Sequence, residues 1–196
     1  MKRVLTALAI TATLGVAVPA LAADGAEVGK PAPAFKLKDE AGKEHSLAQY
    51  QGKIVVLEWT NPDCPFVQRH YKADTMQNTL KGVDGKKVVW LAVNSTASNT
   101  PDKSAAWKKE EALTYPVLQD AEGKVGKAYG ARTTPHMYVI DEKGVLQYAG
   151  AIDDDPRGKN ATPVNHVKTT VDALLTGKPV PAATTEPYGC SVKYKS

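Results

Sequence analysis

The sequence predicts an α/β fold in which helices flank a central mixed β-sheet. Two near-continuous apolar runs, residues 54–59 and 87–93, are typical of strands that are buried on both faces of a sheet. Segments with a helical pattern follow them, at residues 65–80 and 101–113. Strands that alternate with helices favour a parallel arrangement, and a later hairpin at residues 137–148 adds an antiparallel part. The pattern contains one such core, so we expect one domain.

Length and composition agree with a folded domain and exclude several classes of protein. The chain has 196 residues, of which 42% are hydrophobic and 23% are charged, and this excludes a mostly disordered protein. A formal net charge of +4 does not indicate a dedicated nucleic-acid binder. Two cysteines are too few for a disulfide-dense scaffold or a four-cysteine zinc site.

The first 22 residues are predicted to be a signal peptide. Lys2 and Arg3 precede an apolar run at residues 4–18, and small residues at Ala20 and Ala22 match a signal-peptidase site. The run is shorter than the ~20 residues that span a bilayer, so we expect cleavage after Ala22 and no membrane span in the mature protein. The short basic start looks bacterial, which predicts a periplasmic or secreted protein in a compartment where cysteines can pair.

The remaining elements follow from local patterns. A small, proline-containing lead-in opens the predicted domain, which covers residues 23–177, and an irregular tail at residues 178–196 carries Cys190. Thr100 is placed to cap a helix whose first position is Pro101. The other expected elements are a strand at 35–38, an extended stretch at 115–118, a helical turn at 123–129 and a helix at 164–175.

Cys64 is the centre of the predicted chemistry. It follows a buried strand and a turn, and Pro65 marks the first turn of the next helix. Unpaired N–H groups and the helix dipole at that end stabilise a thiolate, which is the reactive form of cysteine. The alternative is a buried structural cysteine.

Two segments carry a resemblance to a known family. The run from Lys53 to Val67 places an apolar strand, an acidic residue and a Cys-Pro pair in the order of a thioredoxin active-site segment. Thr134-Pro135 and the apolar residues after it are similar to the cis-proline loop and its strand. Over residues 28–176 the chain resembles the thioredoxin-like superfamily, as a redoxin or thiol-specific antioxidant-like exported protein. The resemblance implies a thioredoxin-like fold with Thr134 and Pro135 lying against the reactive cysteine.

One departure from that family bears on mechanism. Thioredoxins carry a second cysteine three residues after the first, and here that position is Val67. Cys190 is the candidate resolving thiol within the chain, because a tail of roughly 20 residues reaches far at ~3.3 Å per residue. A redox-active Cys64–Cys190 pair, a permanent disulfide and two unpaired thiols all remain open.

Glu58 is a further candidate site residue. It lies six positions before Cys64 in an otherwise apolar strand. A buried carboxyl has a raised pKa and can exchange a proton with a thiol, and the resemblance implies that role. The alternative is a solvent-facing glutamate at a strand end.

The other polar residues are expected to have structural roles. In a thioredoxin-like fold His136 lies near Cys64, whereas His70 does not share the helix face of Cys64. His45 and His166 look like surface residues, and Asp153–Asp155 looks like a solvated loop. We therefore expect neither a bound metal nor a cofactor, since no Gly-rich fingerprint follows a strand.

Three functions stay open at this point. The first is thiol–disulfide exchange with a protein partner, with Cys64 as nucleophile. The second is a peroxiredoxin-like peroxidase that reduces hydroperoxides, because residues 28–35 are similar to the start of that branch. Its Pro-x-x-x-Thr-x-x-Cys motif fails at Leu57 and Asn61, and Pro135 stands where that branch has an arginine. The third is a non-catalytic module that binds metal or docks a partner. The sequence does not indicate an oligomeric state.

Overall fold

The computed structural model describes residues 25–83, 85 and 87–196. The predicted signal peptide and its cleavage site therefore lie outside the described residues. Within the described part of the chain, every helix is too short or too polar to cross a membrane.

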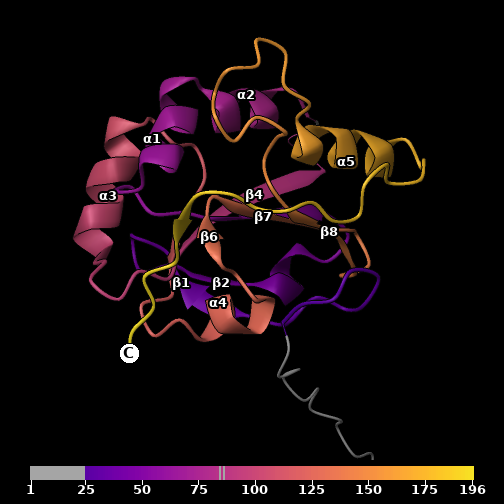
Figure 1. Ribbon diagram of the computed structural model, residues 1–196. Helices are drawn as coiled ribbons and strands as arrows, with labels where there is room; N and C mark the ends of the chain where they lie inside the picture. The colour runs from indigo at the N-terminus through magenta and orange to yellow at the C-terminus, as the bar shows by residue number, and fades with distance from the viewer. Residues whose placement is uncertain (1–24, 84, 86) are drawn as a thin grey trace, which may run out of the picture.

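A seven-stranded mixed sheet forms the centre of the molecule (Figure 1). Its strand order is β2-β1-β5-β4-β3-β7-β8. The three middle strands β3, β4 and β5 are parallel, and β7 pairs antiparallel with β3. The strands are β1 (Lys36–Lys38), β2 (Glu44–Ser46), β3 (Ile54–Trp59), β4 (Val88–Asn94), β5 (Val117–Gln119), β7 (His136–Ile140) and β8 (Leu146–Gly150). The predicted α/β architecture with a central mixed sheet is confirmed.

Each face of the sheet has its own apolar core, because successive strand residues point to opposite faces. On one face, Ile54 and Val56 pack with side chains from α1 (Pro65–Lys72), α2 (Thr75–Lys81), α3 (Pro101–Glu110) and α5 (His166–Leu175). On the other face, Val55, Leu57 and Trp59 pack with α4 (Lys124–Tyr129). Figure 1 shows α4 below the sheet, α2 and α5 above it, and α1 and α3 on the left.

The helix predicted at residues 65–80 is two helices. α1 ends at Lys72, and Asp74 adopts a left-handed conformation with φ 52° before α2 begins at Thr75. Aspartate tolerates this conformation better than most residues, so the chain turns without a glycine or proline. The prediction of one continuous helix was wrong.

The prediction of an irregular tail was also wrong in part. Residues Cys190–Ser191 form strand β9, which pairs antiparallel with β6 (Thr133–Thr134) in a second, two-stranded sheet. In Figure 1 the yellow tail crosses the molecule between the helical layer and β6. The sequence pattern also missed β2 and the 3-10 helix η1 (Leu47–Tyr50), both too short to show a period.

Candidate active site

The fold places Cys64 at the junction of β3 and α1. Cys64 is the N-cap residue of α1, with an extended backbone at φ −84° and ψ 122°, and Pro65 is at the first helical position. The side chain is buried, with an exposed fraction of 1%. The sequence predicted this local geometry, because a strand, a turn and a Cys-Pro pair fix it within a few residues.

The second cysteine lies directly against the first. Cys64 Sγ and Cys190 Sγ are 2.6 Å apart, although 126 positions separate them in the chain. The structure assigns no disulfide to the two residues, and Cys190 is partly exposed. The tail therefore brings the candidate resolving thiol to the candidate nucleophile.

Thr134 and Pro135 form the third side of the site. The Thr134–Pro135 peptide bond is cis, and the Thr134 carbonyl oxygen lies 3.0 Å from Cys64 Sγ. Thr134 also pairs with Cys190 across the β6–β9 ladder. Gly189 makes this close approach feasible, because its φ is 135° and a Cβ there would collide with the Thr134 carbonyl oxygen. The structure thus brings Cys64, Cys190, Thr134 and Pro135 together.

The two thiols differ in acidity. Burial disfavours the Cys64 thiolate, but hydrogen bonds to it, led by the one with the Cys190 side chain, outweigh burial and lower the pKa of Cys64. Burial and the hydrogen bond with Cys64 raise the pKa of Cys190 to about 11. Cys64 is therefore the better nucleophile, and Cys190 is the proton donor of the pair.

Glu58 lies in the sheet beneath the site. It is fully buried on β3, on the same sheet face as Ile54 and Val56. Its partners among the described residues are the Tyr71 hydroxyl, 2.8 Å from Oε1, and the Trp90 indole N–H, 2.9 Å from Oε2. Burial raises its pKa to about 7. The expectation of a buried acid with a raised pKa agrees with this geometry, whereas its proton exchange with Cys64 stays a prediction.

Several polar residues lie elsewhere than the sequence indicated. His45 is buried, with an exposed fraction of 5%, and bonds Asp39 and Tyr50, so its assignment to the surface was wrong. Asp153 is equally buried, so the acidic loop is not solvated throughout. The ring of His136 lies 3.1 Å from the Tyr138 hydroxyl. Within the described residues, His, Cys, Asp and Glu side chains form no cluster of three suited to a metal ion.

Comparison with known proteins identifies the family to which the chain belongs. Residues 28–149 match the AhpC/TSA family over more than half of the chain. The chain belongs to the AhpC/TSA family. This is a thioredoxin-like redoxin family, and thioredoxin-like thiol–disulfide oxidoreductases of known structure share the fold. The predicted resemblance and fold class are therefore confirmed.

Individual relatives of this AhpC/TSA chain include both thiol oxidoreductases and peroxiredoxins. The thioredoxin-like protein YneN of Bacillus subtilis is 33% identical, over 63% of this chain and 71% of its own. Peroxiredoxin-2 of Pongo abelii is 30% identical, over 71% of this chain and 85% of its own. In the crystal structure of hypothetical protein SMc02350 from Sinorhizobium meliloti 1021, the similarity covers 87% of this chain and 96% of that one, with 28% identity and a TM-score of 0.76. Thiol redox or peroxiredoxin-like activity is thus supported for the family as a whole.

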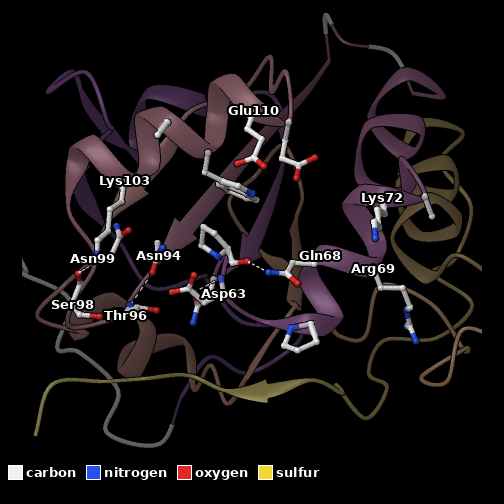
Figure 2. Close-up of a pocket in the computed structure, with 17 residues that line it drawn as sticks. Asp63, Gln68, Arg69, Lys72, Asn94, Thr96, Ser98, Asn99, Lys103 and Glu110 are labelled. Atoms are coloured by element: carbon white, nitrogen blue, oxygen red, sulfur yellow. Dashed lines mark hydrogen bonds between the residues drawn. The ribbon is translucent and has the colours of Figure 1, made fainter.

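A polar groove flanks the turn that carries Cys64. It lies between α1 and α3, has a volume of about 980 Å³ and reaches the turn at Asn61 and Asp63 (Figure 2). Lys72 and Lys103 contribute positive charge, and Glu110 contributes negative charge. The residues that line the groove do not include Cys64, so its contents would touch the active-site turn rather than the sulfur.

Proposed function

We propose that the protein is an exported thiol–disulfide oxidoreductase in which Cys64 is the nucleophile and Cys190 is the resolving thiol. The observation that carries the proposal is the 2.6 Å separation of the two sulfur atoms together with their opposite pKa shifts. A low-pKa thiol attacks, and a neighbouring high-pKa thiol keeps its proton until it is needed.

The proposed reaction has two balanced steps. The Cys64 thiolate attacks one sulfur of a substrate disulfide, forms a mixed disulfide and releases the other substrate sulfur as a thiolate. Cys190, after losing its proton, then attacks the Cys64 sulfur, and the second substrate thiolate leaves. The substrate gains two electrons, and the protein ends with a Cys64–Cys190 disulfide. A thiol reductant returns the protein to its starting state.

The electrostatic interaction between the two thiols makes the attack by Cys64 precede the attack by Cys190. The charge on Cys64 is one cause of the raised pKa of Cys190. Once Cys64 is bonded to substrate it carries no charge, so this part of the shift disappears and Cys190 ionises more easily. The first step therefore prepares the second.

The test is the reduction of a model protein disulfide, such as insulin, with a dithiol as the reductant. We expect Cys64→Ser to abolish turnover. Cys190→Ser is expected to accumulate a mixed disulfide at Cys64, detected by mass spectrometry of non-reduced protein. Equal turnover by wild type and Cys64→Ser would contradict the proposal and favour the non-catalytic module.

A second candidate function is a thiol peroxidase. Membership of the AhpC/TSA family and the similarity to peroxiredoxin-2 favour it. In this reaction Cys64 is oxidised by a hydroperoxide to a sulfenic acid, and Cys190 condenses with it to release water. Leu57 and Asn61 replace the proline and threonine of the peroxidatic motif, and Pro135 stands where that branch has an arginine, so we place this function second. Rapid hydrogen peroxide consumption that depends on Cys64, without insulin reduction, would reverse the order.

A further inference from the structure

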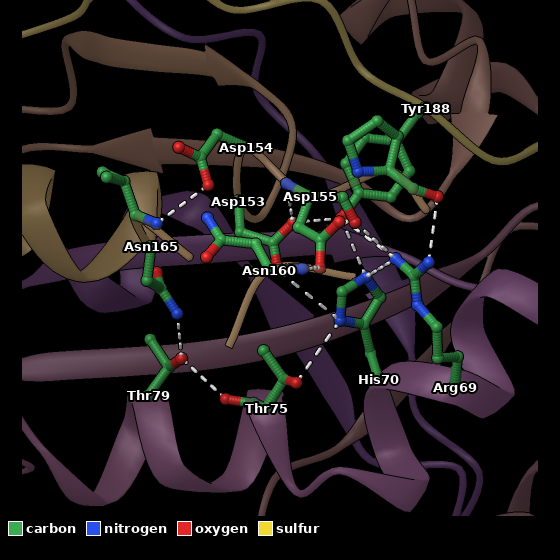
Figure 3. Close-up of polar contacts among 12 residues, drawn as sticks. Arg69, His70, Thr75, Thr79, Asp153, Asp154, Asp155, Asn160, Asn165 and Tyr188 are labelled. Atoms are coloured by element: carbon green, nitrogen blue, oxygen red, sulfur yellow. Dashed lines mark hydrogen bonds and ion pairs between the residues drawn. The ribbon is translucent and has the colours of Figure 1, made fainter. Parts of the chain in front are cut away.

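A partly buried polar cluster holds the tail two residues before Cys190 (Figure 3). The Tyr188 hydroxyl donates a hydrogen bond to Asp153 Oδ1. It also lies 3.0 Å from His70 Nε2 and 3.4 Å from Arg69 Nη2. We call Arg69, His70, Asp153 and Tyr188 the Tyr188 latch.

The latch is anchored in two parts of the domain. Arg69 and His70 belong to α1, and Asp153 belongs to the loop that follows β8. Arg69 also donates hydrogen bonds of 3.0 and 2.9 Å to the carbonyl oxygens of Asp155 and Pro156. Helix and loop are therefore tied together before the tail adds Tyr188.

The latch favours a hydroxyl at position 188, because two of the groups that bond to it are buried. His70 and Asp153 have exposed fractions of 3% and 5%. Burial and the hydrogen bond with Asp153 raise the pKa of Tyr188, so its hydroxyl keeps its proton and donates it. Hydrogen bonds to a charged, buried acceptor are among the stronger ones in proteins.

The Tyr188 ring is packed as well as bonded. It lies against Phe66 and His70, with ring centroids 6.1 and 6.0 Å away. The Arg69 guanidinium lies 5.7 Å from the Tyr188 ring centroid. All three contacts come from α1, the helix that begins directly after Cys64. One helix thus positions both the nucleophile and the segment that carries the second thiol.

We propose that Tyr188 is a positioning residue that sets the effective concentration of Cys190 at Cys64 through its partly buried contacts with Asp153, His70 and Arg69. This inference rests on the proposed function of the two thiols and adds a mechanism for it.

β9 pairs with β6 over two residues, and a two-residue ladder is weak by itself. On its C-terminal side the tail is also held by the Val192 N–H, which donates to the Arg132 carbonyl oxygen, and by the Tyr194 hydroxyl, which donates to the Ala131 carbonyl oxygen. The latch holds the chain on the N-terminal side of Cys190, two residues away.

The experiment measures the equilibrium between the Cys64–Cys190 disulfide and a glutathione redox buffer in full-length mature protein. We compare wild type with Tyr188→Phe, which removes the hydroxyl and keeps the ring. Tyr50→Phe is the matched control, because its hydroxyl also bonds a buried histidine, His45, in a separate cluster. Urea unfolding of the three reduced proteins reports their overall stability.

We expect Tyr188→Phe to lower the effective concentration of Cys190 about tenfold, the size of effect that loss of a buried hydrogen bond to a charged group produces. Tyr50→Phe should leave it unchanged. An effective concentration in Tyr188→Phe equal to that of wild type would overturn the latch and leave the proposed function intact. Equal decreases in both variants would also overturn it, because they would reflect general stability. Failure of wild type to form the Cys64–Cys190 disulfide would overturn the proposed function and, with it, the latch.

Discussion

The Glu58 carboxyl ties the stability of the protein to pH. Its pKa rises from 4.5 to about 7 on folding, because the side chain is fully buried. Below pH 4.5 the carboxyl is neutral in both states. Between pH 4.5 and 7 it ionises only in the unfolded chain, so the free energy of unfolding falls as pH rises, by about 3 kcal/mol in total. Above pH 7 it is ionised in both states and the decrease ends.

Substitution Glu58→Gln tests this effect, because glutamine resembles the protonated acid. The free energy of unfolding of wild type should fall between pH 5 and pH 8 by about 2.5 kcal/mol more than that of the variant, because part of the total is already lost at pH 5. Glu186→Gln is the control, since the Glu186 side chain is 83% exposed. If the free energy of unfolding had the same pH dependence in Glu58→Gln and in wild type, folding would not raise the pKa of Glu58.

The acidity of Cys64 depends on its partner. The hydrogen bond from Cys190 is the leading cause that lowers the pKa of Cys64 against the cost of burial. We therefore expect Cys190→Ala to raise the pKa of Cys64, measured from the ultraviolet absorbance of the thiolate as a function of pH. Ser191→Ala, the next residue of β9, serves as the control and should leave the curve in place. A lower pKa in Cys190→Ala would mean that the tail acts on Cys64 mainly by burying it.

At the level of elements, Gly189 decides whether β9 can dock. A Cβ at Gly189 would collide with the Thr134 backbone, and side-chain movement cannot relieve a clash with backbone. We expect Gly189→Ala to push β9 away from Cys64, so that alkylation of reduced Cys64 by iodoacetamide becomes faster and formation of the Cys64–Cys190 disulfide becomes less favourable.

The control variant Gly144→Ala distinguishes the effect of a Cβ clash at Gly189 from the effect of backbone strain at a positive φ. Gly144 also has a positive φ, 81°, but a Cβ there points into open space within the described part of the chain. Gly144→Ala should cost about 1 kcal/mol of stability and leave Cys64 alkylation unchanged. Equal alkylation rates in both variants and wild type would contradict a docked β9 in solution.

The elements that the sequence predicted are those fixed by local patterns. The apolar runs of β3 and β4, the Cys64-Pro65 junction and the Thr134-Pro135 loop each depend on a few adjacent residues. The break between α1 and α2 at Asp74 escaped prediction, because neither proline nor glycine marks it. β9 escaped for another reason: its two residues form a strand only because Thr133–Thr134 lies beside them in the fold.

The same distinction holds within the site. Cys64 and Glu58 could be predicted from their place in one strand-turn-helix segment, and Cys190 from the simple count of thiols. The latch could not be predicted, because His70 and Asp153 are 83 positions apart and become partners only in the folded protein. A buried Asp153 in a sequence context of three aspartates is a product of tertiary packing.

At the scale of the whole molecule, the free energy of forming the Cys64–Cys190 disulfide and the free energy of unfolding are linked. In the chain-entropy model, closing a loop of 126 positions stabilises the fold by roughly 5 kcal/mol. By linkage, the Cys64–Cys190 disulfide must form more favourably in the folded protein than in the unfolded chain, and by the same free energy. We therefore expect oxidised wild type to unfold at a higher urea concentration than the reduced form.

Because of this linkage, the latch can also be tested by measuring how much oxidation stabilises the protein against urea. If Tyr188→Phe lowers the effective concentration of Cys190 about tenfold, oxidation must stabilise this variant by about 1.4 kcal/mol less than it stabilises wild type. The comparison uses urea unfolding of oxidised and reduced forms of both proteins. In Tyr50→Phe the stability gained on oxidation should equal that of wild type, even where its absolute stability is lower. A full gain in Tyr188→Phe would be inconsistent with a weaker disulfide in the folded state, and the Tyr188 hydroxyl would then have no part in holding Cys190 at Cys64.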